Sequence, residues 1–461
     1  MIIDLSAGTD LVTFAKKCGG VAFGNAAIDS VSIDSRENGK NTLFAAVKGE
    51  NTDGHVYIAK AAENGAACVL CERMPEGVSL PYILVKDTIE ALAEYARTLR
   101  NEYSPFTVGV TGSVGKTTTK EFVSAVLGVR YPTLKSGGNF NTIYGLTLTV
   151  ASMNPIHKAL VLEMGMSRPG EIEQMTMTAL PDVAVITNVG TAHIENLGSR
   201  ENIAKAKLEI VKGVKKGGCV VFNADEPLLE KEREKFGNSL GFGIANENSD
   251  AFGFNVRSDD GSTTLFDIRF KGDTVKDVRI PAVGLHNVCN ALSAFCVGKT
   301  AGLTDDEIKT GLMLYRTTGM RQKIYEKNGY TVIEDCYNAS PESMKASISV
   351  LSQFGKSKRT VAVLGEMREL GVFSDELHKE VGEFVYKSGI DRLYTYGSAA
   401  LEIAVGALQS GMDESKLAAY SKVEEPEGMA KLIKKDLRQG DVVLFKASRA
   451  VALENVIKYL D

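Results

Sequence analysis

Short apolar runs alternate with amphipathic segments along most of the chain. Four of the runs, at residues 66–71, 159–162, 183–186 and 219–222, are apolar at every position. A strand that is apolar on both faces is typical of a parallel sheet with helices on both sides. The pattern therefore predicts an α/β fold built on parallel sheets.

Changes in this pattern divide the chain into three predicted domains. Residues 1–104 alternate short strands and helices, and the polar segment 101–105 (Asn-Glu-Tyr-Ser-Pro) is predicted to be a linker. Residues 105–315 carry three of the continuous apolar runs and then two alternating runs, which are typical of an antiparallel hairpin. Residues 316–461 form a third, smaller α/β unit.

Individual elements follow from the same periodicity. We expect further strands at 30–36, 42–47, 81–85, 107–112, 252–256, 265–270, 330–334, 360–364, 392–396 and 441–445, and helices at 57–64, 89–99, 119–127, 201–212 and 287–301. The alternation of strands with helices in each unit favours the α/β class throughout.

The composition is that of a globular protein. Of 461 residues, 44% are hydrophobic and 24% charged, a balance that argues against wholesale disorder. No window reaches the ~18 uncharged apolar residues of a membrane helix, and Met1-Ile2-Ile3-Asp4 does not resemble the start of a signal peptide. We therefore expect no membrane insertion. A net charge of −5 gives no general case for nucleic-acid binding.

The seven cysteines favour a cytoplasmic protein. Their number is odd and they are scattered, so they do not form a disulfide framework. Cys68 and Cys71 form a Cys-x-x-Cys motif, but an offset of three on a strand places the two thiols on opposite faces. Because no second such motif or histidine pair completes a zinc site, we interpret both as core residues.

A glycine-rich segment between a strand and a helix has the composition of a phosphate-binding loop. Residues 112–118 are Gly-Ser-Val-Gly-Lys-Thr-Thr. Small residues allow backbone N–H groups to surround phosphates, Lys116 would reach the β- and γ-phosphates, and the Thr117 hydroxyl would bind Mg²⁺. The general pattern has glycine where Val110 stands, and the alternative is a glycine-rich turn without a nucleotide.

Glu163 and His193 are candidates for the same site. Glu163 ends the strand at 159–162, and His193 follows the strand at 183–186. Both are thus expected at the carboxyl edge of the sheet, where α/β proteins bind ligands. Each alone is a weak indication, because a glutamate at a strand end is usually solvated and a loop histidine is usually not a ligand.

Lys207 lies on the apolar face of the helix predicted at 201–212. It shares that face with Ile203, Ile210 and Val214, while Lys205 and Lys212 point the other way. A lysine on such a face either extends to solvent or is held beside negative charge. The spacing alone leaves both alternatives open.

Five segments resemble, in order, motifs of the Mur ligases, the ATP-dependent amide ligases of peptidoglycan precursor synthesis. They are Thr-Gly-Ser-Val-Gly-Lys-Thr at 111–117, Glu-Met-Gly-Met at 163–166, Ile-Thr-Asn-Val-Gly-Thr-Ala-His at 186–193, Ala-Lys-Ala-Lys at 204–207 and Gly-Leu-His-Asn-Val-Cys-Asn at 284–290. The resemblance implies a central P-loop ATPase domain with a parallel sheet. A small N-terminal α/β domain for the UDP substrate and a C-terminal ligase domain with a dinucleotide-fold-like α/β structure would flank it.

The C-terminal segments resemble those of the family members that attach a dipeptide. They are Asp-Cys-Tyr-Asn-Ala-Ser-Pro at 335–341, Leu-Gly-Glu-Met-Arg-Glu-Leu-Gly at 364–371 and Lys-Ala-Ser-Arg at 446–449. The resemblance implies that ATP phosphorylates the carboxylate of UDP-N-acetylmuramoyl-tripeptide and that D-alanyl-D-alanine attacks the acyl phosphate. It also implies a monomer, and it leaves open whether the third peptide residue is lysine or diaminopimelate. Departures from the usual motifs at Thr142, Thr147, Ser340 and Ala447 avoid the phosphate and metal positions.

The resemblance also implies roles for individual residues. The implied catalytic residues are Lys116, Glu163, His193 and Lys207, and the implied ligands of two Mg²⁺ ions are Thr117, Glu163, His193 and a carbamylated Lys207. The implied ATP-binding residues are Gly112, Ser113, Val114, Gly115, Lys116, Thr117, Thr118, Asn287, Asn290, Arg321 and Asp335. The implied substrate-binding residues are Ser35, Arg36, Asn139, Asn338 and Lys446. From the residues alone, Asn287 and Asn290 are equally compatible with a helix-capping pair.

Two other functions fit parts of the sequence. Folylpolyglutamate synthase also has a P-loop and a similar C-terminal domain, but the segments at 34–36 and 53–55 resemble a uridine-nucleotide domain instead. A non-catalytic nucleotide-binding regulator would not need Lys116, Glu163 and Lys207 to be intact. The substrate that the protein uses would distinguish a Mur ligase from a folylpolyglutamate synthase. The absence of turnover would indicate a non-catalytic regulator.

Overall fold

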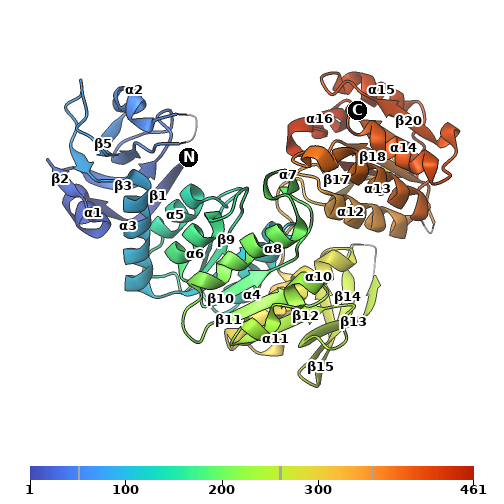
Figure 1. The fold of residues 1–461 in the computed structure, drawn as a ribbon, viewed down its shortest axis with the longest axis horizontal. Coiled ribbons are helices and arrows are strands. Elements are labelled where there is room, and N and C mark those ends of the chain that lie inside the picture. The colour runs from blue at the N-terminus through green and yellow to red at the C-terminus, as the bar shows by residue number, and fades with distance from the viewer. Residues whose placement is uncertain (50–51, 259–261, 356, 461) are drawn as a thin grey trace.

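The computed structural model describes residues 1–49, 52–258, 262–355 and 357–460, and its strands form three sheets. The N-terminal domain (blue) and the C-terminal domain (red) lie on opposite sides of the central one (Figure 1). Helices cover the faces of each sheet. The predicted α/β class with three domains is therefore confirmed.

The N-terminal sheet is mixed and has the order β1-β3-β4-β5-β6-β2. Its strands are β1 (Ile2–Asp10), β2 (Val21–Phe23), β3 (Ala27–Ser32), β4 (Thr42–Ala45), β5 (Ala66–Cys71) and β6 (Tyr82–Leu84), and its helices are α1 (Leu11–Cys18), α2 (Ile58–Glu63) and α3 (Thr88–Tyr103). Cys68 packs in the core that includes α1 and α3, whereas Cys71 packs in the core that includes α2. The two thiols thus lie on opposite faces of β5, as predicted.

The central sheet has the order β15-β14-β13-β12-β11-β10-β7-β9-β8. Its strands are β7 (Phe106–Thr111), β8 (Thr133–Lys135), β9 (Ala159–Glu163), β10 (Val183–Ile186), β11 (Cys219–Asn223), β12 (Ser239–Gly243), β13 (Ala251–Ser258), β14 (Thr264–Phe270) and β15 (Asp273–Ile280). Strands β7 to β13 are parallel, and β14 and β15 are antiparallel additions at one edge, where the alternating runs predicted a hairpin.

Helices on both faces explain why β9 and β10 are apolar at every position. The helices of this domain are α4 (Lys116–Gly128), α5 (Ile143–Ala151), α6 (Glu171–Ala179), α7 (Ile194–Leu197), α8 (Arg200–Leu208), α9 (Pro227–Glu230), α10 (Leu285–Thr300) and α11 (Asp305–Met313). Val161 and Val185 pack with α4, α10 and α11, whereas Leu162 and Ile186 belong to the core with α5, α6 and α8. Each strand therefore buries both of its faces.

The C-terminal sheet has the order β16-β17-β21-β18-β19-β20 and is parallel except for the edge strand β16. Its strands are β16 (Lys323–Lys327), β17 (Tyr330–Asp335), β18 (Thr360–Gly365), β19 (Arg392–Tyr396), β20 (Leu417–Tyr420) and β21 (Val442–Lys446), and its helices are α12 (Pro341–Phe354), α13 (Ser374–Lys387), α14 (Leu401–Gln409), α15 (Pro426–Lys434) and α16 (Glu454–Lys458). The polar run of β16 was not predicted. Asn328 and Gly329, which connect it to β17, both have positive φ (49° and 83°), as a tight hairpin turn requires.

Three elements differ from the prediction in extent. Helix α3 runs through most of the predicted linker to Tyr103 and ends where Ser104 adopts a left-handed φ of 45°. Helix α4 begins at Lys116, so the lysine of the glycine-rich segment belongs to the first helical turn. Helix α8 ends at Leu208 and continues as a 3₁₀ turn over Glu209–Gly213. Among the described residues, no helix is both long enough and apolar enough to cross a membrane.

The outer domains are attached to the central domain in different ways. Helix α3 of the N-terminal domain packs on α5 and α6, and the Arg100 guanidinium donates a 2.6 Å hydrogen bond to the Leu180 carbonyl. The C-terminal domain reaches α7 through the turn Gly371–Phe373, and the Glu195 N–H donates to the Glu369 carbonyl at 3.3 Å. The first junction is an extended helix–helix contact, and the second is smaller and combines polar contacts with apolar ones, since Ile194 and Leu370 belong to one buried cluster.

Candidate nucleotide and ligase site

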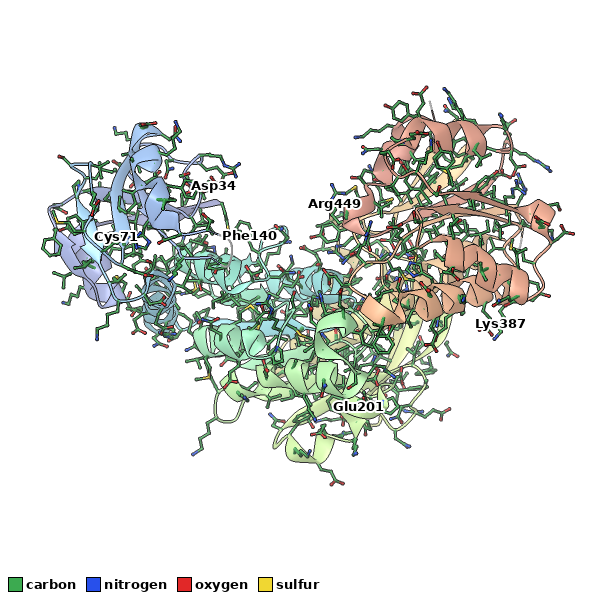
Figure 2. All side chains as sticks on the ribbon, turned by 45° about the horizontal axis from the view of Figure 1, so that its top comes forward. Asp34, Cys71, Phe140, Glu201, Lys387 and Arg449 are labelled. Atoms are coloured by element: carbon green, nitrogen blue, oxygen red, sulfur yellow. The ribbon has the colours of Figure 1, made fainter. Side chains whose placement is uncertain are left out.

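A cavity of about 1450 Å³ lies where the three domains meet. Its walls include Thr52 from the N-terminal domain, Lys116 and Glu163 from the central domain, and Arg321 from the C-terminal domain. Asp34 and Arg449 lie on the sides of the two outer domains that face each other across this region (Figure 2). A ligand in this cavity would contact side chains from all three domains.

The glycine-rich segment 112–115 connects β7 to α4 and is held by the loop after β10. The Asn188 side chain accepts hydrogen bonds from the N–H groups of Ser113 (3.1 Å) and Val114 (2.9 Å), and it donates to the Val114 carbonyl at 3.0 Å. A Cβ at Gly112 would lie 1.8 Å from Thr187 Oγ1, and one at Gly115 would lie 2.7 Å from Asn290 Oδ1. Both glycines are therefore required by close approach, and Val110, the departure from the general pattern, lies inside β7.

Lys116 folds back over this loop. Its Nζ donates to the carbonyl oxygens of Gly112 (2.8 Å) and Ser113 (3.4 Å). Burial lowers the pKa of Lys116, and the nearby Glu163 carboxylate opposes that shift. The ammonium thus lies at the loop, where phosphate oxygens could take the place of the two carbonyls.

Glu163 faces the start of α4, as its position at the end of β9 predicted. Val110 of β7 is in register with Glu163, so the neighbouring strands present their carboxyl ends together. Thr117 Oγ1 donates to Glu163 Oε2 at 2.9 Å, and the Asn141 amide donates to Glu163 Oε1 at 3.1 Å. The buried carboxylate is therefore fixed at both oxygens.

The Thr117 hydroxyl and the Glu163 carboxylate suit Mg²⁺. Both are hard oxygen donors, and Mg²⁺ at nucleotide sites usually takes only one or two protein ligands beside phosphate oxygens and water. Within the described ranges, no group of three or more His, Cys, Asp or Glu residues is arranged to hold a metal ion. The donors fit an ion that a bound nucleotide completes.

His193 contacts the C-terminal domain. Its Nδ1 lies 2.5 Å from Glu369 Oε2, and its φ of 65° is left-handed. The same contact lowers the pKa of Glu369. Next to His193, the Thr191 N–H and hydroxyl donate to Glu342 Oε1 at 2.7 and 3.0 Å. Two carboxylates of the C-terminal domain therefore hold the loop that carries His193.

Lys207 lies on the apolar face of α8, as predicted, and is buried there. Its side chain is 1% exposed, and Ile203 and Ile210 beside it are fully buried, whereas Lys205 and Lys212 are exposed. Burial and, to a smaller extent, the charge of Lys116 hold the pKa of Lys207 well below its ordinary value, while Glu342 opposes this shift. The lysine therefore does not extend to solvent, which excludes one of the two alternatives that the spacing left open.

Asn287 and Asn290 face the glycine-rich loop from α10. Thr119 Oγ1 donates to Asn290 Oδ1 at 3.1 Å, and the Asn287 amide donates to Gln322 Oε1 of the C-terminal domain at 2.7 Å. The N-cap of α10 is Gly284, and no side chain caps it. The pair therefore does not cap the helix and lines the cavity instead.

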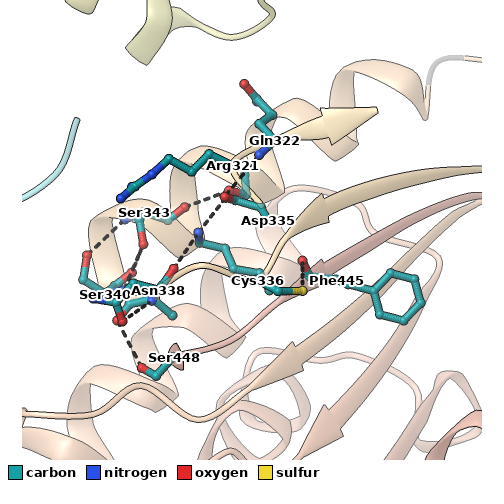
Figure 3. A network of polar contacts seen from close by, with 12 residues as sticks. Arg321, Gln322, Asp335, Cys336, Asn338, Ser340, Ser343, Phe445 and Ser448 are labelled. Atoms are coloured by element: carbon teal, nitrogen blue, oxygen red, sulfur yellow. Dashed lines mark hydrogen bonds and ion pairs between the residues drawn. The ribbon is translucent and has the colours of Figure 1, made fainter. Parts of the chain in front are cut away.

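A polar network in the C-terminal domain holds Asp335 at the end of β17 (Figure 3). Asp335 Oδ2 accepts hydrogen bonds of 2.6 Å from both Lys446 Nζ and Ser347 Oγ, and Lys446 also donates to the Asn338 carbonyl at 3.1 Å. The Arg321 guanidinium stacks on the Tyr337 ring, with its Cζ 3.9 Å from the ring centroid. Because these residues line the same cavity as Lys116, the structure brings together these predicted sites of two domains.

The predicted substrate residues are placed unequally. Asn139, Asn338 and Lys446 line the cavity. Ser35 and Arg36 do not: the exposed Arg36 guanidinium pairs with Asp34 at 2.7 Å, on the N-terminal domain. Ile33, Val47, Gly49 and Thr52 represent that domain in the cavity wall instead.

Several residues of the site were missed in the sequence. Asn188 lies two positions after the end of β10, the same carboxyl-edge position that pointed to Glu163, so its location could have been found. Asn141 has no comparable pattern, and Glu342 and Glu369 reach the site only across a domain junction.

The three-sheet α/β architecture with a phosphate loop at a cavity between domains is that of ATP-dependent amide ligases, and the chain belongs to the Mur ligase family. Three sequence profiles match it: the Mur ligase family catalytic domain at residues 27–100, the Mur ligase middle domain at 110–298 and the Mur ligase glutamate ligase domain at 320–449. The chain is 40% identical to the UDP-N-acetylmuramoyl-tripeptide–D-alanyl-D-alanine ligase of Bacillus subtilis, over 94% of this chain and 93% of that protein.

Two crystal structures have the same fold over nearly the whole chain. One is MurF from Acinetobacter baumannii, with a TM-score of 0.88, 28% identity and 98% of both chains covered. The other is the MurF ligase from Thermotoga maritima in complex with ADP, with a TM-score of 0.82 and 36% identity over 93% of this chain and 96% of that one.

Proposed function

We propose that this protein joins D-alanyl-D-alanine to the tripeptide carboxylate of UDP-N-acetylmuramoyl-tripeptide, with conversion of ATP to ADP and phosphate. The product is UDP-N-acetylmuramoyl-pentapeptide, a peptidoglycan precursor. The relative from Bacillus subtilis and the two MurF structures support this reaction.

One observation carries the proposal: the phosphate loop and Glu163 open into a cavity that all three domains line. An amide forms from a carboxylate near neutral pH only after activation. The proposed step transfers the γ-phosphoryl group of ATP to the carboxylate, and the dipeptide amine then displaces phosphate from the acyl phosphate. A cavity between domains allows two substrates and a nucleotide to meet while water is kept out.

The loop residues Gly112, Ser113, Val114, Gly115 and Thr118 would surround the phosphates with backbone and side-chain donors. Lys116 would leave the two loop carbonyls and bind β- and γ-phosphate oxygens. Thr117 and Glu163 would hold a Mg²⁺ ion, which neutralises phosphate charge when bound. The 2.9 Å contact between these two side chains supports this assignment.

His193 and a carbamylated Lys207 are the proposed ligands of a second Mg²⁺ ion. Carbamylation needs an unprotonated amine, which attacks CO₂ and loses its proton to leave an anionic carbamate. A buried lysine whose pKa is strongly lowered meets that requirement. Full activity of Lys207→Ala would contradict the role, and rescue of that variant by millimolar formate or acetate would support it.

Residues from two domains are proposed to bind the rest of ATP. Asn287 and Asn290 would read the adenine, since an amide offers both a donor and an acceptor. Arg321 would approach the phosphates and Asp335 the ribose. Their contacts at the domain junction support a role in closing the C-terminal domain on the nucleotide.

The remaining assignments follow the same reading of the sequence. We propose Ser35, Arg36, Asn139, Asn338 and Lys446 as substrate contacts, with domains at 1–104, 105–315 and 316–461. We also propose a cytoplasmic monomer that binds no nucleic acid and does not insert into a membrane.

The test is phosphate release by the purified protein with ATP and Mg²⁺, leaving out one substrate at a time. The acceptors are UDP-N-acetylmuramoyl-tripeptides that end in lysine or in diaminopimelate, and the amine is D-alanyl-D-alanine. We expect turnover only with both substrates, and a pentapeptide product by mass. ATP binding without turnover on either tripeptide would favour a regulator, and turnover with a free amino acid or a folate would indicate a different ligase.

A further inference from the structure

A second lysine of α4, Lys120, lies behind the proposed Mg²⁺ carboxylate and has no part in the roles above. It follows Lys116 by one helical turn. Its side chain is only 1% exposed, and it does not line the cavity. A fully buried lysine is rare unless its charge is compensated, so its surroundings need an explanation.

Lys120 lies among two carboxylates and one carbonyl. Its Nζ donates to the Ser136 carbonyl at 2.9 Å and lies 3.3 Å from Glu121 Oε1 and 3.6 Å from Glu163 Oε2. Glu121 also pairs with Lys135, whose side chain is 42% exposed. Lys120 thus connects a structural ion pair near the surface to Glu163 at the cavity.

The contacts of Lys120 reach Glu163 from two directions. One is the direct approach to Oε2, the same oxygen that accepts from Thr117. The other runs through Ser136, whose carbonyl accepts from Lys120 and whose Oγ accepts from the Glu163 N–H at 3.1 Å. The side chain and the backbone of Glu163 are therefore both tied to Lys120.

A carboxylate as buried as Glu163 needs a compensating charge when no cation occupies the cavity side. Thr117 and Asn141 are neutral donors, so Lys120 supplies the nearest positive charge to Oε2. We propose that Lys120 is a positioning residue that holds the Glu163 carboxylate against Thr117, in the orientation in which Mg²⁺ and nucleotide bind together. This inference rests on the proposed function, because it takes Glu163 as a Mg²⁺ ligand.

The experiment compares ADP binding with and without Mg²⁺ by calorimetry, in the wild type and in Lys120→Met. We expect Mg²⁺ to raise the ADP affinity of the wild type. In Lys120→Met, this Mg²⁺-dependent increase in affinity should be smaller by a factor of about ten or more, the usual cost of removing a residue that orients a metal ligand. ADP binding without Mg²⁺ should change less than about twofold, because the phosphate loop keeps its own contacts. Lys120→Arg should retain most of the gain.

Lys135→Met is the matched control, since it removes the other lysine of the cluster but not the one near Glu163. It should keep the full Mg²⁺ effect. The double variant Lys120→Met/Glu121→Gln removes a buried charge of each sign and so keeps the cluster balanced. It should fold as the wild type does and still lack the Mg²⁺ effect, which separates positioning from a purely structural role.

The outcomes distinguish this inference from the proposed function. A wild type whose ADP binding ignores Mg²⁺ overturns the proposed Mg²⁺ site and this inference together. If Mg²⁺ raises the ADP affinity of the wild type and of Lys120→Met equally, the role of Lys120 alone is overturned. A double variant that shows the full wild-type increase in ADP affinity would overturn it as well.

Discussion

The two sides of the cavity are built differently. On the phosphate side, Thr117, Glu163 and Asn188 belong to one sheet edge and hydrogen-bond within one domain. On the opposite side, Asp335 and Lys446 pair within the C-terminal domain, but the polar contacts of that domain with the phosphate side, such as Glu342 with Thr191, cross a domain junction.

Contacts on the phosphate side are fixed by strand register, whereas contacts across the cavity depend on the relative position of two domains. The register of β7, β9 and β10 fixes the phosphate side before any ligand binds. Small junctions between domains allow relative motion. We therefore expect variants on the phosphate side to change binding directly, and variants at the junction to change mainly how the domains dock.

Lys116→Ala should give the largest effect. The lysine is the cation that would stabilise charge on the transferred phosphoryl group, and removing one such group typically costs about 10²–10³-fold in rate. The melting temperature should change little, because the unfavourable burial of the ammonium opposes the two hydrogen bonds that it donates to the loop carbonyls. Phosphate release and thermal melting check both. Lys212→Ala, on the exposed face of the 3₁₀ turn after α8, is the control, and equal activity of the two variants would contradict the phosphate-loop assignment.

Lys446→Met should be the most destabilising of these variants. It leaves the buried Asp335 carboxylate without its cation, and breaking a buried pair costs about 3–5 kcal/mol. Burial raises the pKa of Asp335, but Lys446 and Ser347 more than offset this and lower it overall. The pair therefore stabilises the fold fully at pH values above the ordinary pKa of an aspartate. This contribution is lost as the pH falls through the lowered pKa of Asp335. Denaturant unfolding at several pH values measures this. If the free energy of unfolding of the variant depends on pH as in the wild type, the pair does not stabilise the C-terminal side of the cavity.

Much of the fold could be predicted because it depends on local patterns. The continuous runs that became β5, β9, β10 and β11 have no other way to bury both faces. The edge strand β16 was missed, since its polar run Lys-Ile-Tyr-Glu-Lys lacks that pattern.

The candidate site divides in the same way. Glu163 could be placed at the site from the strand end, and Lys207 could be placed on the buried face of α8 from the helical spacing. Glu342 and Glu369 could not, because their contacts with Thr191 and His193 join segments about 150 or more residues apart across a junction that no local pattern encodes.

Gly112→Ala should weaken nucleotide binding by an intermediate amount. The new Cβ would lie 1.8 Å from Thr187 Oγ1, which itself donates to the Val114 carbonyl at 2.6 Å, so the loop must shift. Such overpacking costs about 1–3 kcal/mol, or about five- to 150-fold in ADP affinity. Gly128→Ala is the matched control, because nothing lies within 4 Å of that position. Similar ADP affinities in the two variants would mean that the loop tolerates a side chain at its first glycine.

Glu342→Ala should give the smallest effect and tests the junction itself. It removes the carboxylate that accepts two hydrogen bonds from Thr191, worth about 1–2 kcal/mol each at this part-buried contact. The melting temperature should stay within a degree or two, since neither core loses a contact, while small-angle scattering of the ligand-free protein should show a larger radius of gyration. Glu342→Gln keeps an acceptor oxygen, so its radius of gyration should lie between those of the wild type and Glu342→Ala. Glu376→Ala, on the exposed start of α13, should have the radius of gyration of the wild type. A strongly lowered melting temperature would mean that this junction belongs to the folded core, and the contrast between the two sides of the cavity would then fail.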